Sequence, residues 1–306
     1  MPESEKHAPP SPSHPERAII DYEGSTYETD FWGSGSREYE DRAERIALRH
    51  LLPKHGHRLL EIGAGYGRLT AEYHAFEHIV VMDYSLSHLQ AAQNRLGAAP
   101  RFTYVAADVY RLPFAAASFD AVTLIRVLHH LVDAPAALQE IARVSCRGAC
   151  FILEYANARN LKAMLRYAFR RQSTSPYRYE PTEFVTLNFD FHPRYISDAL
   201  QQAGFQNESK RPVSFLRLGI LKRIFPAAWL AAFDAVLQTT GALYSPSIFT
   251  RNRLIQDEAL ARAERLIFTC PSCHVPLQRE NESWRCSAGC RYLIRDGIHD
   301  FREQLS

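Results

Sequence analysis

The chain has 306 residues, of which 46% are hydrophobic and 23% charged, values that are ordinary for a globular protein with a substantial buried core. Its formal net charge of +2 excludes a general attraction of the whole molecule to nucleic acid or membrane, so any such contact must be local. The longest apolar stretch, residues 224–237, contains Asp234 and a proline and is too short to span a bilayer.

The first sixteen residues are rich in proline, serine and charge, and they contain no apolar segment. This composition predicts a disordered tail over residues 1–17 rather than a signal peptide. Without a leader or a membrane span, the expected location is cytoplasmic, where thiols stay reduced. Clustered cysteines are therefore expected to bind metal before they form disulfides.

Residues 37–52 combine helical spacing with dense charge and predict a surface helix. Strand-like and helix-like segments then alternate: strands are expected at 58–64, 78–84, 102–109, 119–128 and 149–156, and helices after the first strand, over 85–97 and over 133–145. Ser85 is placed to cap the second of these helices and Gly97 to end it. Continuous apolar strands separated by helices predict a doubly wound α/β fold, whose parallel strands end at one edge where such sheets bind ligands.

Residues 159–255 have a less regular pattern. They predict a basic amphipathic helix over 159–172, a helix over 192–205 that stops at Gly204, a strand within 207–218, an apolar helical stretch and a strand over 245–251. A polar helix over 256–266 is expected to lead into the cysteine-rich end.

Three glycines, Gly63, Gly65 and Gly67, follow the first strand in the run "EIGAGYG". Glycines at a strand end let the backbone approach a ligand closely, and a following helix would offer free N–H groups. The dinucleotide fingerprint G-x-G-x-x-G needs its third glycine where Arg68 stands. Glu61 precedes the run, and a carboxylate attracts an ammonium group more readily than a pyrophosphate. A ligand with a cationic amino-acid end and a nucleoside end therefore fits better than NAD.

The next two strands end in acids that suit the nucleoside end. Asp83 lies twenty positions after Gly63, where a carboxylate can accept bonds from both ribose hydroxyls, and Tyr84 can pack on an adenine face. Asp108 can bond the adenine amino group, and the Val109 backbone its ring edge.

These motifs, together with "LPFAAASFDAVTLIRVLHHL", make residues 40–155 resemble the class I S-adenosylmethionine-dependent methyltransferases, most closely the quinone-biosynthesis branch. The resemblance implies a seven-stranded, mostly parallel sheet over a catalytic domain at 18–255, with the strand at 245–251 inserted antiparallel as the last one. It implies S-adenosylmethionine as methyl donor, bound by Glu61, Gly63, Ala64, Gly65, Gly67, Asp83, Tyr84, Asp108 and Val109. Arg68 is expected to face solvent or a local carboxylate.

The residues that follow the fourth strand do not identify the acceptor atom. They contain neither the Asn/Asp-Pro-Pro-aromatic signature of exocyclic amino methylation nor a cysteine for covalent pyrimidine chemistry. His129, His130 and Tyr155 are candidate bases, but the histidines are more readily interpreted as a helix cap and a side chain beside the cofactor. The general base stays unassigned. Cys146 and Cys150 are expected to be core residues.

The C-terminal region holds Cys270, Cys273, Cys286 and Cys290, two cysteine pairs separated by twelve residues. Four thiolates complete the tetrahedral shell of a structural Zn²⁺ and leave no open catalytic position. A segment this short needs metal binding to fold. Residues 269–306 resemble the small zinc-ribbon activator of several RNA and protein methyltransferases and are expected to form a zinc ribbon after a helical linker over 256–268. Whether the ribbon supports the fold, mediates dimerisation or binds substrate stays open.

Several acceptors are compatible with the sequence. An aromatic-rich middle segment, residues 174–192, favours a lid over a small-molecule acceptor. The ribbon and a cationic helical face (Arg159, Lys162, Arg166, Arg170) would suit RNA, although such faces are often only solvated. The same helix with the segment around Trp229 would also suit an anionic membrane surface. A non-catalytic scaffold is disfavoured because it has no reason to retain three buried carboxylates. The oligomeric state is not predicted.

Overall fold

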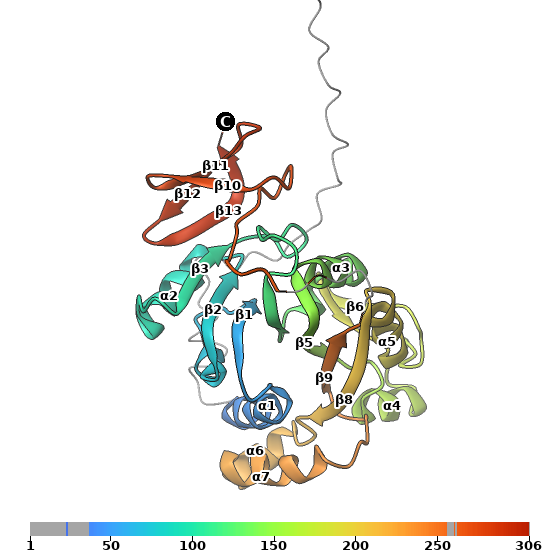
Figure 1. The fold of residues 1–306 in the computed structure, drawn as a ribbon. Coiled ribbons are helices and arrows are strands. Elements are labelled where there is room, and N and C mark those ends of the chain that lie inside the picture. The colour runs from blue at the N-terminus through green and yellow to red at the C-terminus, as the bar shows by residue number, and fades with distance from the viewer. Residues whose placement is uncertain (1–22, 24–36, 256–259, 261, 306) are drawn as a thin grey trace, which may run out of the picture.

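The computed structural model describes residues 23, 37–255, 260 and 262–305, and Figure 1 draws their arrangement. A mostly parallel sheet forms the centre of the described part. Seven of its strands lie before residue 255, namely β1 (Gly56–Ile62), β2 (Phe76–Asp83), β3 (Phe102–Ala106), β4 (Phe119–Leu124), β5 (Ser145–Ala156), β8 (Phe205–Val213) and β9 (Ser247–Leu254). They lie in the order β3-β2-β1-β4-β5-β9-β8.

Strands β1 to β5 pair in parallel, whereas β9 is antiparallel to both β5 and β8. The predicted doubly wound fold with an inserted antiparallel strand is therefore confirmed. The sequence of each parallel strand is a run of mostly apolar residues, because helices cover both faces of the sheet.

The helices are α1 (Glu38–Leu51), α2 (Leu86–Leu96), α3 (Ala134–Val144), α4 (Leu161–Ala168), α5 (Pro193–Gln202), α6 (Gly219–Ile224) and α7 (Ala227–Leu237). The Ser85 side chain caps α2 by accepting from His88 N, and Gly97 ends that helix at a φ of +82°. Asp133 caps α3 through Ala136 N. These caps satisfy backbone donors that a helix leaves unpaired, so the local sequence sets where both helices begin.

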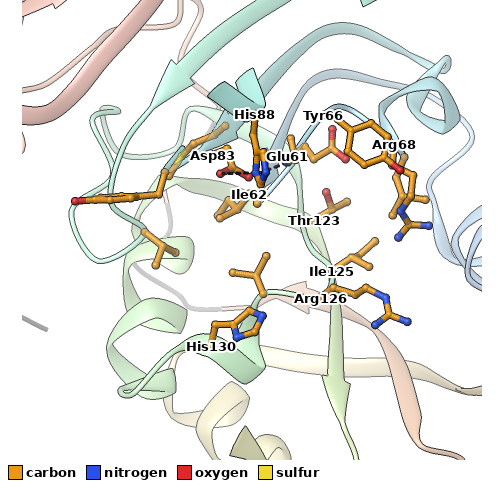
Figure 2. Close-up of a pocket in the computed structure, with 18 of the residues that line it drawn as sticks. Glu61, Ile62, Tyr66, Arg68, Asp83, His88, Thr123, Ile125, Arg126 and His130 are labelled. Atoms are coloured by element: carbon orange, nitrogen blue, oxygen red, sulfur yellow. Dashed lines mark hydrogen bonds and ion pairs between the residues drawn. The ribbon is translucent and has the colours of Figure 1, made fainter. Parts of the chain in front are cut away.

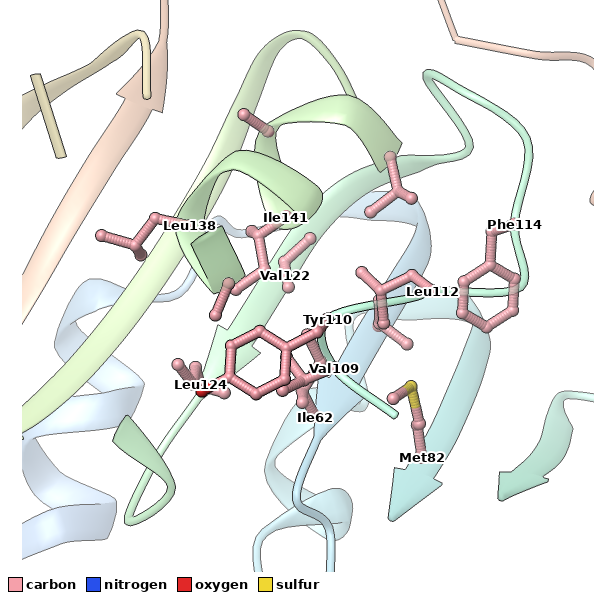
Figure 3. Close-up of a cluster of buried hydrophobic side chains, with 14 of the residues drawn as sticks. Ile62, Met82, Val109, Tyr110, Leu112, Phe114, Val122, Leu124, Leu138 and Ile141 are labelled. Atoms are coloured by element: carbon pink, nitrogen blue, oxygen red, sulfur yellow. The ribbon is translucent and has the colours of Figure 1, made fainter. Parts of the chain in front are cut away.

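The core beneath the strand ends joins β1, β2 and β4 to α3 (Figure 3). Leu124 and Val122 on β4 pack in one cluster with Leu138 and Ile141 on α3, and all four are fully buried. Burying a side chain of this size contributes roughly 1.5–3 kcal/mol. The strand ends that carry polar residues are therefore held on a rigid support.

The helix expected directly after β1 is not formed. Residues 63–69 form turns and are followed only by a short 3₁₀ helix, Thr70–Tyr73. Gly63, Gly65 and Gly67 adopt φ values of +72°, +55° and +75°, which lie outside the right-handed helical region. The glycine loop is consequently a series of turns, and among the described residues only the short 3₁₀ helix separates it from β2.

The C-terminal region forms four antiparallel strands, β10 (Leu277–Glu280), β11 (Ser283–Cys286), β12 (Arg291–Arg295) and β13 (Ile298–Leu305). Strand β13 also pairs in parallel with β3, so the ribbon continues the central sheet (Figure 1). The sequence did not indicate this junction.

The expected helical linker is wrong for the described residues of 256–268, namely 260 and 262–268, which adopt no helix. Their backbone groups bond to other segments instead: Arg147 N donates to Leu260 O, and Ala263 N donates to Ala117 O. Because these groups pair with neighbouring segments, they are not available to an internal helical ladder. Residues 256–259 and 261, like the expected tail at 1–17, lie outside the described residues.

Further elements surround the carboxyl ends of the parallel strands. A hairpin of β6 (Thr182–Val185) and β7 (Asn188–Asp190) follows α4, and α6 with α7 connects β8 to β9. Among the described helices, none has the length and apolar character needed to cross a membrane.

Candidate cofactor site

A cavity opens at the carboxyl edge of the sheet, where β1, β2 and β4 end and the chain leaves β3 (Figure 2). We call it the edge cavity. Eight of the nine residues predicted to bind cofactor line it: Glu61, Gly63, Ala64, Gly65, Asp83, Tyr84, Asp108 and Val109. Gly67 is absent from its lining. The parallel pairing of the strands thus brings residues almost fifty positions apart to one place.

The three glycines serve different purposes. A Cβ on Gly63 would lie 2.0 Å from Val127 Cγ2, and one on Gly67 would lie 2.8 Å from Leu96 Cδ1. Both positions therefore need glycine for packing as well as for their positive φ. A Cβ on Gly65 would meet no atom within 4 Å. Since Gly65 lines the edge cavity, the space beside it is available to a ligand.

We expect Gly65→Ala to weaken binding of S-adenosylmethionine at least about tenfold, because the added methyl takes space in the edge cavity. Gly148→Ala is the matched control, since Gly148 also has a positive φ (+77°) and open space around it but does not line the cavity. Both changes should cost roughly 1–2 kcal/mol of stability from backbone strain. Equal cofactor affinity of the two variants by calorimetry would contradict this role of Gly65.

Glu61 lies at the floor of the edge cavity and is buried. Its carboxylate accepts hydrogen bonds from Thr70 Oγ1 at 2.6 Å and from Tyr73 OH at 3.2 Å. Burial raises the pKa of Glu61 to about 7, and the two hydroxyl donors oppose that rise only in part. A buried carboxyl with this pKa gains a partner when a cationic group enters, which fits the ammonium end of the expected ligand.

This pKa predicts that cofactor affinity depends on pH. In the free protein Glu61 is mostly protonated below pH 7, and a bound ammonium favours its carboxylate, so binding releases a proton. Affinity should therefore fall by up to about tenfold for each pH unit below 7 and level off above it. Calorimetry across this range tests the effect, and Glu61→Gln should remove it. An unchanged pH profile in that variant would show that another group is responsible.

Asp83 holds the glycine loop against the end of β2. Its Oδ2 accepts from Gly65 N at 2.8 Å, and its Oδ1 accepts from Ser85 N at 2.9 Å. Burial raises the pKa of Asp83, and the backbone donors oppose the rise. Each carboxylate oxygen keeps a second lone pair for a ligand hydroxyl.

Asp108 and Tyr84, two of the other predicted nucleoside contacts, also line the edge cavity. Asp108 Oδ1 accepts from Tyr110 N at 2.9 Å, which fixes the turn after β3. Tyr84 contacts the ribbon: the Arg302 guanidinium lies 5.7 Å from the centre of its ring and donates to its carbonyl oxygen at 3.2 Å. Arg302 is in turn paired with Asp300 at 2.9 Å. The ribbon therefore reaches the residue expected to pack on the adenine.

A charged cluster closes the opposite side of the cavity. Glu44 on α1 is fully buried and accepts from Arg126 Nε at 2.7 Å and from Arg68 Nη2 at 2.7 Å. Although burial opposes ionisation, these two guanidinium groups hold the pKa of Glu44 at about 2. Arg68 also pairs with Asp41, so its predicted contact with a local carboxylate is confirmed. Arg126 has a φ of +59°, and its N–H donates to the Glu154 carboxylate at 2.9 Å.

The two histidines after β4 differ in placement. His130 lines the edge cavity and donates from Nδ1 to Leu187 O at 3.2 Å, while burial lowers its pKa. His129 is also largely buried, its pKa is lowered by burial, and its Nδ1 has no hydrogen-bond partner within the described residues. Neither caps α3, because Asp133 does so; that interpretation of the sequence was wrong.

Tyr155, the remaining candidate base, and the two cysteines discussed with it lie away from the edge cavity. Tyr155 is buried in the core, burial raises its pKa, and it does not line the cavity. Cys146 and Cys150 are buried thiols whose pKa values burial raises to about 11. They are packing residues, as predicted.

Several lining residues were not predicted. They are Tyr66, Leu69, Tyr73, Met82, His88, Thr123, Ile125, Arg126, Val127 and Leu131, with Ile62, Arg68 and Ala107 beside the predicted positions. Of these, Ile62, Met82 and Thr123 lie in strands, and most of the others lie in the segments that follow strand ends. Arg126 carried the one recognisable signal, a charge two positions beyond a buried strand.

The four ribbon cysteines come together. Their Sγ atoms all lie within 4.8 Å of one another, and Cys273 Sγ lies 3.6 Å from Cys286 Sγ. A tetrahedral Zn²⁺ with Zn–S bonds of about 2.3 Å requires sulfur atoms about 3.8 Å apart. The donor set therefore fits a zinc ion. His299 is not part of it, since its Nδ1 accepts from Trp284 Nε1 at 3.1 Å.

Known proteins resemble the chain over the same region. Residues 60–153 match the family model described as a methyltransferase domain. The demethylmenaquinone methyltransferase of Clavibacter sepedonicus is 35% identical over 115 residues, which is 37% of this chain and 47% of that protein. That of Mycolicibacterium paratuberculosis is 39% identical over 116 residues, with 37% and 48% covered. The chain thus spans about half the length of the curated relatives it matches.

Two solved structures share the fold at low identity. One is a Haloferax volcanii chain from a complex of the Trm112 methyltransferase activator with a methyltransferase, with a TM-score of 0.53 and 16% identity over 75% of this chain and 96% of that one. The other is an S-adenosylmethionine-dependent methyltransferase from Thermotoga maritima, with a TM-score of 0.52 and 18% identity over 76% and 98%. Strand order, edge cavity and family match agree: residues 60–153 are a methyltransferase domain of the class I, S-adenosylmethionine-dependent type.

Proposed function

We propose that the protein transfers the methyl group of S-adenosylmethionine to a small-molecule acceptor. One observation carries the proposal: Glu61 at the end of β1, Asp83 at the end of β2 and Asp108 in the turn after β3 line a single cavity beside the glycine loop. Three carboxyls in one cavity suit a ligand that carries an ammonium group, two ribose hydroxyls and an adenine amino group.

Each residue has a distinct part in binding. Glu61 would hold the ammonium group, and Asp83 the ribose hydroxyls. Asp108 and the Val109 backbone would bond the adenine edge, with Tyr84 on its face. Gly63, Ala64, Gly65 and Gly67 would shape the loop around the amino-acid end.

The sulfonium of the bound donor supplies an electrophilic methyl group, so the protein has to hold the acceptor in line with it and exclude water. Good alignment of two reactants is equivalent to roughly 7–11 kcal/mol of the barrier. Val127, His130 and Leu131 line the edge cavity on the β4 side and would position the acceptor. Because burial lowers its pKa, His130 is neutral near pH 7 and able to accept a proton from a protonated nucleophile.

The relatives support a small-molecule acceptor, because the named ones methylate demethylmenaquinone. An RNA acceptor is the second candidate. It is favoured by the cations of 159–170. RNA binding would make affinity fall steeply with added salt.

We propose further that Cys270, Cys273, Cys286 and Cys290 bind one structural Zn²⁺ and that residues 269–306 are a zinc ribbon attached to a methyltransferase domain at 18–255. The sulfur spacing supports this assignment. The Zn²⁺ would supply folding energy to the ribbon, and its closed shell of four thiolates leaves no position for substrate.

Two measurements test the proposed function in sequence. Calorimetry with S-adenosylmethionine should give saturable heat at a stoichiometry near one cofactor per chain. Tritium transfer from the labelled donor into a fractionated cell extract should then place label in the small-molecule or lipid fraction. Label in the RNA fraction would favour the second candidate. Cofactor binding without transfer into any fraction would favour a scaffold, and absence of binding would contradict every form of the proposal.

A further inference from the structure

Three helices expose apolar side chains in regular rows. On α4 and its C-terminal cap, Leu161, Leu165 and Phe169 follow one another at four-residue spacing, and Phe169 is 71% exposed. On α7, Trp229 and Phe233 have the same spacing and are 69% and 58% exposed. Residues at this spacing share one face of a helix. Each row is therefore an apolar stripe that no described segment covers.

The connecting helix α6 extends the same surface. Its apolar residues Ile220 and Ile224 are 66% and 63% exposed, and α6 buries no residue. Exposed apolar residues scattered singly are normal in a globular protein, but regular rows on several helices at one edge of the sheet mark a contact surface. We call these exposed rows of α4, α6 and α7 the apolar surface.

The strand order places this surface at the carboxyl edge of the sheet. Helix α4 follows the carboxyl end of β5. Strand β8 runs in the same direction as β5, because β9 is antiparallel to both, so α6 and α7 also follow a carboxyl end. The edge cavity opens at this edge. Figure 1 shows α4, α6 and α7 at the end of the molecule away from β10–β13.

The charge around the apolar surface is positive. Lys162 and Arg166 lie one residue after Leu161 and Leu165, so a cationic stripe runs directly beside the apolar one, and Arg170 and Arg171 follow. No acid occurs between residues 155 and 179 of the sequence. The one acid of 209–255 is Asp234, which is fully buried on α7, where it accepts from Tyr39 OH and Ser214 N.

From these observations we infer that α4, α6 and α7 form a membrane-docking surface that rests on an anionic lipid bilayer. Apolar rows enter the interface between headgroups and acyl chains, while the adjacent cations contact anionic headgroups, as in helices that lie in the membrane plane. Lys222 on α6 is paired with Glu40, so the cations assigned to the lipid are those of α4. Anionic lipid is the occupant that satisfies the apolar rows and the positive charge of α4 together.

Docking in this orientation would turn the edge cavity toward the lipid. If the proposed methyl transfer holds, an acceptor dissolved in the bilayer reaches the cavity without crossing water. The docking itself needs no turnover, so a binding assay tests it separately from the proposed function.

The test is co-sedimentation of the full chain with vesicles of phosphatidylcholine, with or without phosphatidylglycerol. The protein should pellet with the anionic vesicles and stay in solution with the neutral ones. The double change Trp229→Ser and Phe233→Ser should lower the bound-to-free ratio at least about tenfold. The changes Lys162→Glu and Arg166→Glu should remove the preference for anionic lipid.

Ile255→Ser is the matched control, because Ile255 is 53% exposed but follows the end of antiparallel β9, at the opposite edge of the sheet. It should bind vesicles like the natural chain. Unchanged S-adenosylmethionine affinity in all variants would show that they fold. Three outcomes would overturn the inference: no pelleting of the natural chain with anionic vesicles, equal pelleting of the Trp229/Phe233 variant, or a dimer in sedimentation velocity that this variant dissociates.

Discussion

Asp83→Ala is expected to lower the affinity for S-adenosylmethionine at least about a hundredfold. The carboxylate is placed to accept bonds from both ribose hydroxyls, and hydrogen bonds to a charged group contribute about 1.5–3 kcal/mol each. It also accepts from Gly65 N and Ser85 N, so its loss leaves two backbone donors of the edge cavity without this partner. The variant therefore loses its contact with the ligand and also the hydrogen bond that fixes the glycine loop to the end of β2.

Calorimetry measures this loss, and two further variants separate its causes. Asp83→Asn keeps the shape but has one acceptor oxygen in place of two, so its affinity should lie between those of the natural chain and the alanine variant. Asp120→Asn is the matched control, because Asp120 accepts from Arg58 N at 2.7 Å at the other end of the strands and does not line the cavity. Natural affinity in Asp83→Ala would contradict the assigned cofactor site.

Cys286→Ser is expected to unfold the ribbon and to release its Zn²⁺. Zinc binding to four thiolates contributes about 10–16 kcal/mol to small zinc domains, so losing one ligand removes a large share of what stabilises this region. Unfolding the ribbon would also remove β13 from the edge of β3 and Arg302 from Tyr84. We therefore expect S-adenosylmethionine affinity to fall about tenfold as a secondary effect.

Metal analysis and amide hydrogen exchange over residues 277–305 measure the primary effect. Cys146→Ser is the matched control, since Cys146 is buried but lies outside the cysteine cluster, and it should keep the metal and the exchange protection. A chelator should reproduce the Cys286→Ser phenotype in the natural chain. Stoichiometric zinc in Cys286→Ser with unchanged exchange would rule out a four-thiolate site.

Much of the fold was predictable because its signals are local. The strands are apolar runs that the sheet buries on both faces, and α2 and α3 begin at side chains, Ser85 and Asp133, that bond their own helices. The acids and most of the glycines that line the edge cavity were also predictable, because parallel strands deliver their carboxyl ends to one edge. Glu61, Asp83 and Asp108 need only the strand order to meet.

The features that the sequence predicted wrongly, or did not predict, all depend on contacts between residues far apart in the chain. The glycine loop forms turns instead of a helix, with positive φ at Gly63, Gly65 and Gly67, and a side chain at Gly63 would collide with Val127, far along the chain. The segment after residue 259 bonds to 115–117 and 147 rather than to itself. The cluster of Glu44, Arg68 and Arg126 joins three elements, and no spacing in the sequence links them.

The sequence by itself determined the α/β alternation, the acids and glycines that line the edge cavity, and the four cysteines of the ribbon. Each of these follows from residue type and short-range spacing, because backbone geometry allows a short segment only a few conformations. Tertiary structure alone decided that β13 joins β3, that the ribbon contacts Tyr84, and that the apolar rows of α4, α6 and α7 gather at the carboxyl edge. These features depend on which surfaces meet after the chain folds, and that choice is made by shape and burial over the whole molecule rather than by any one segment.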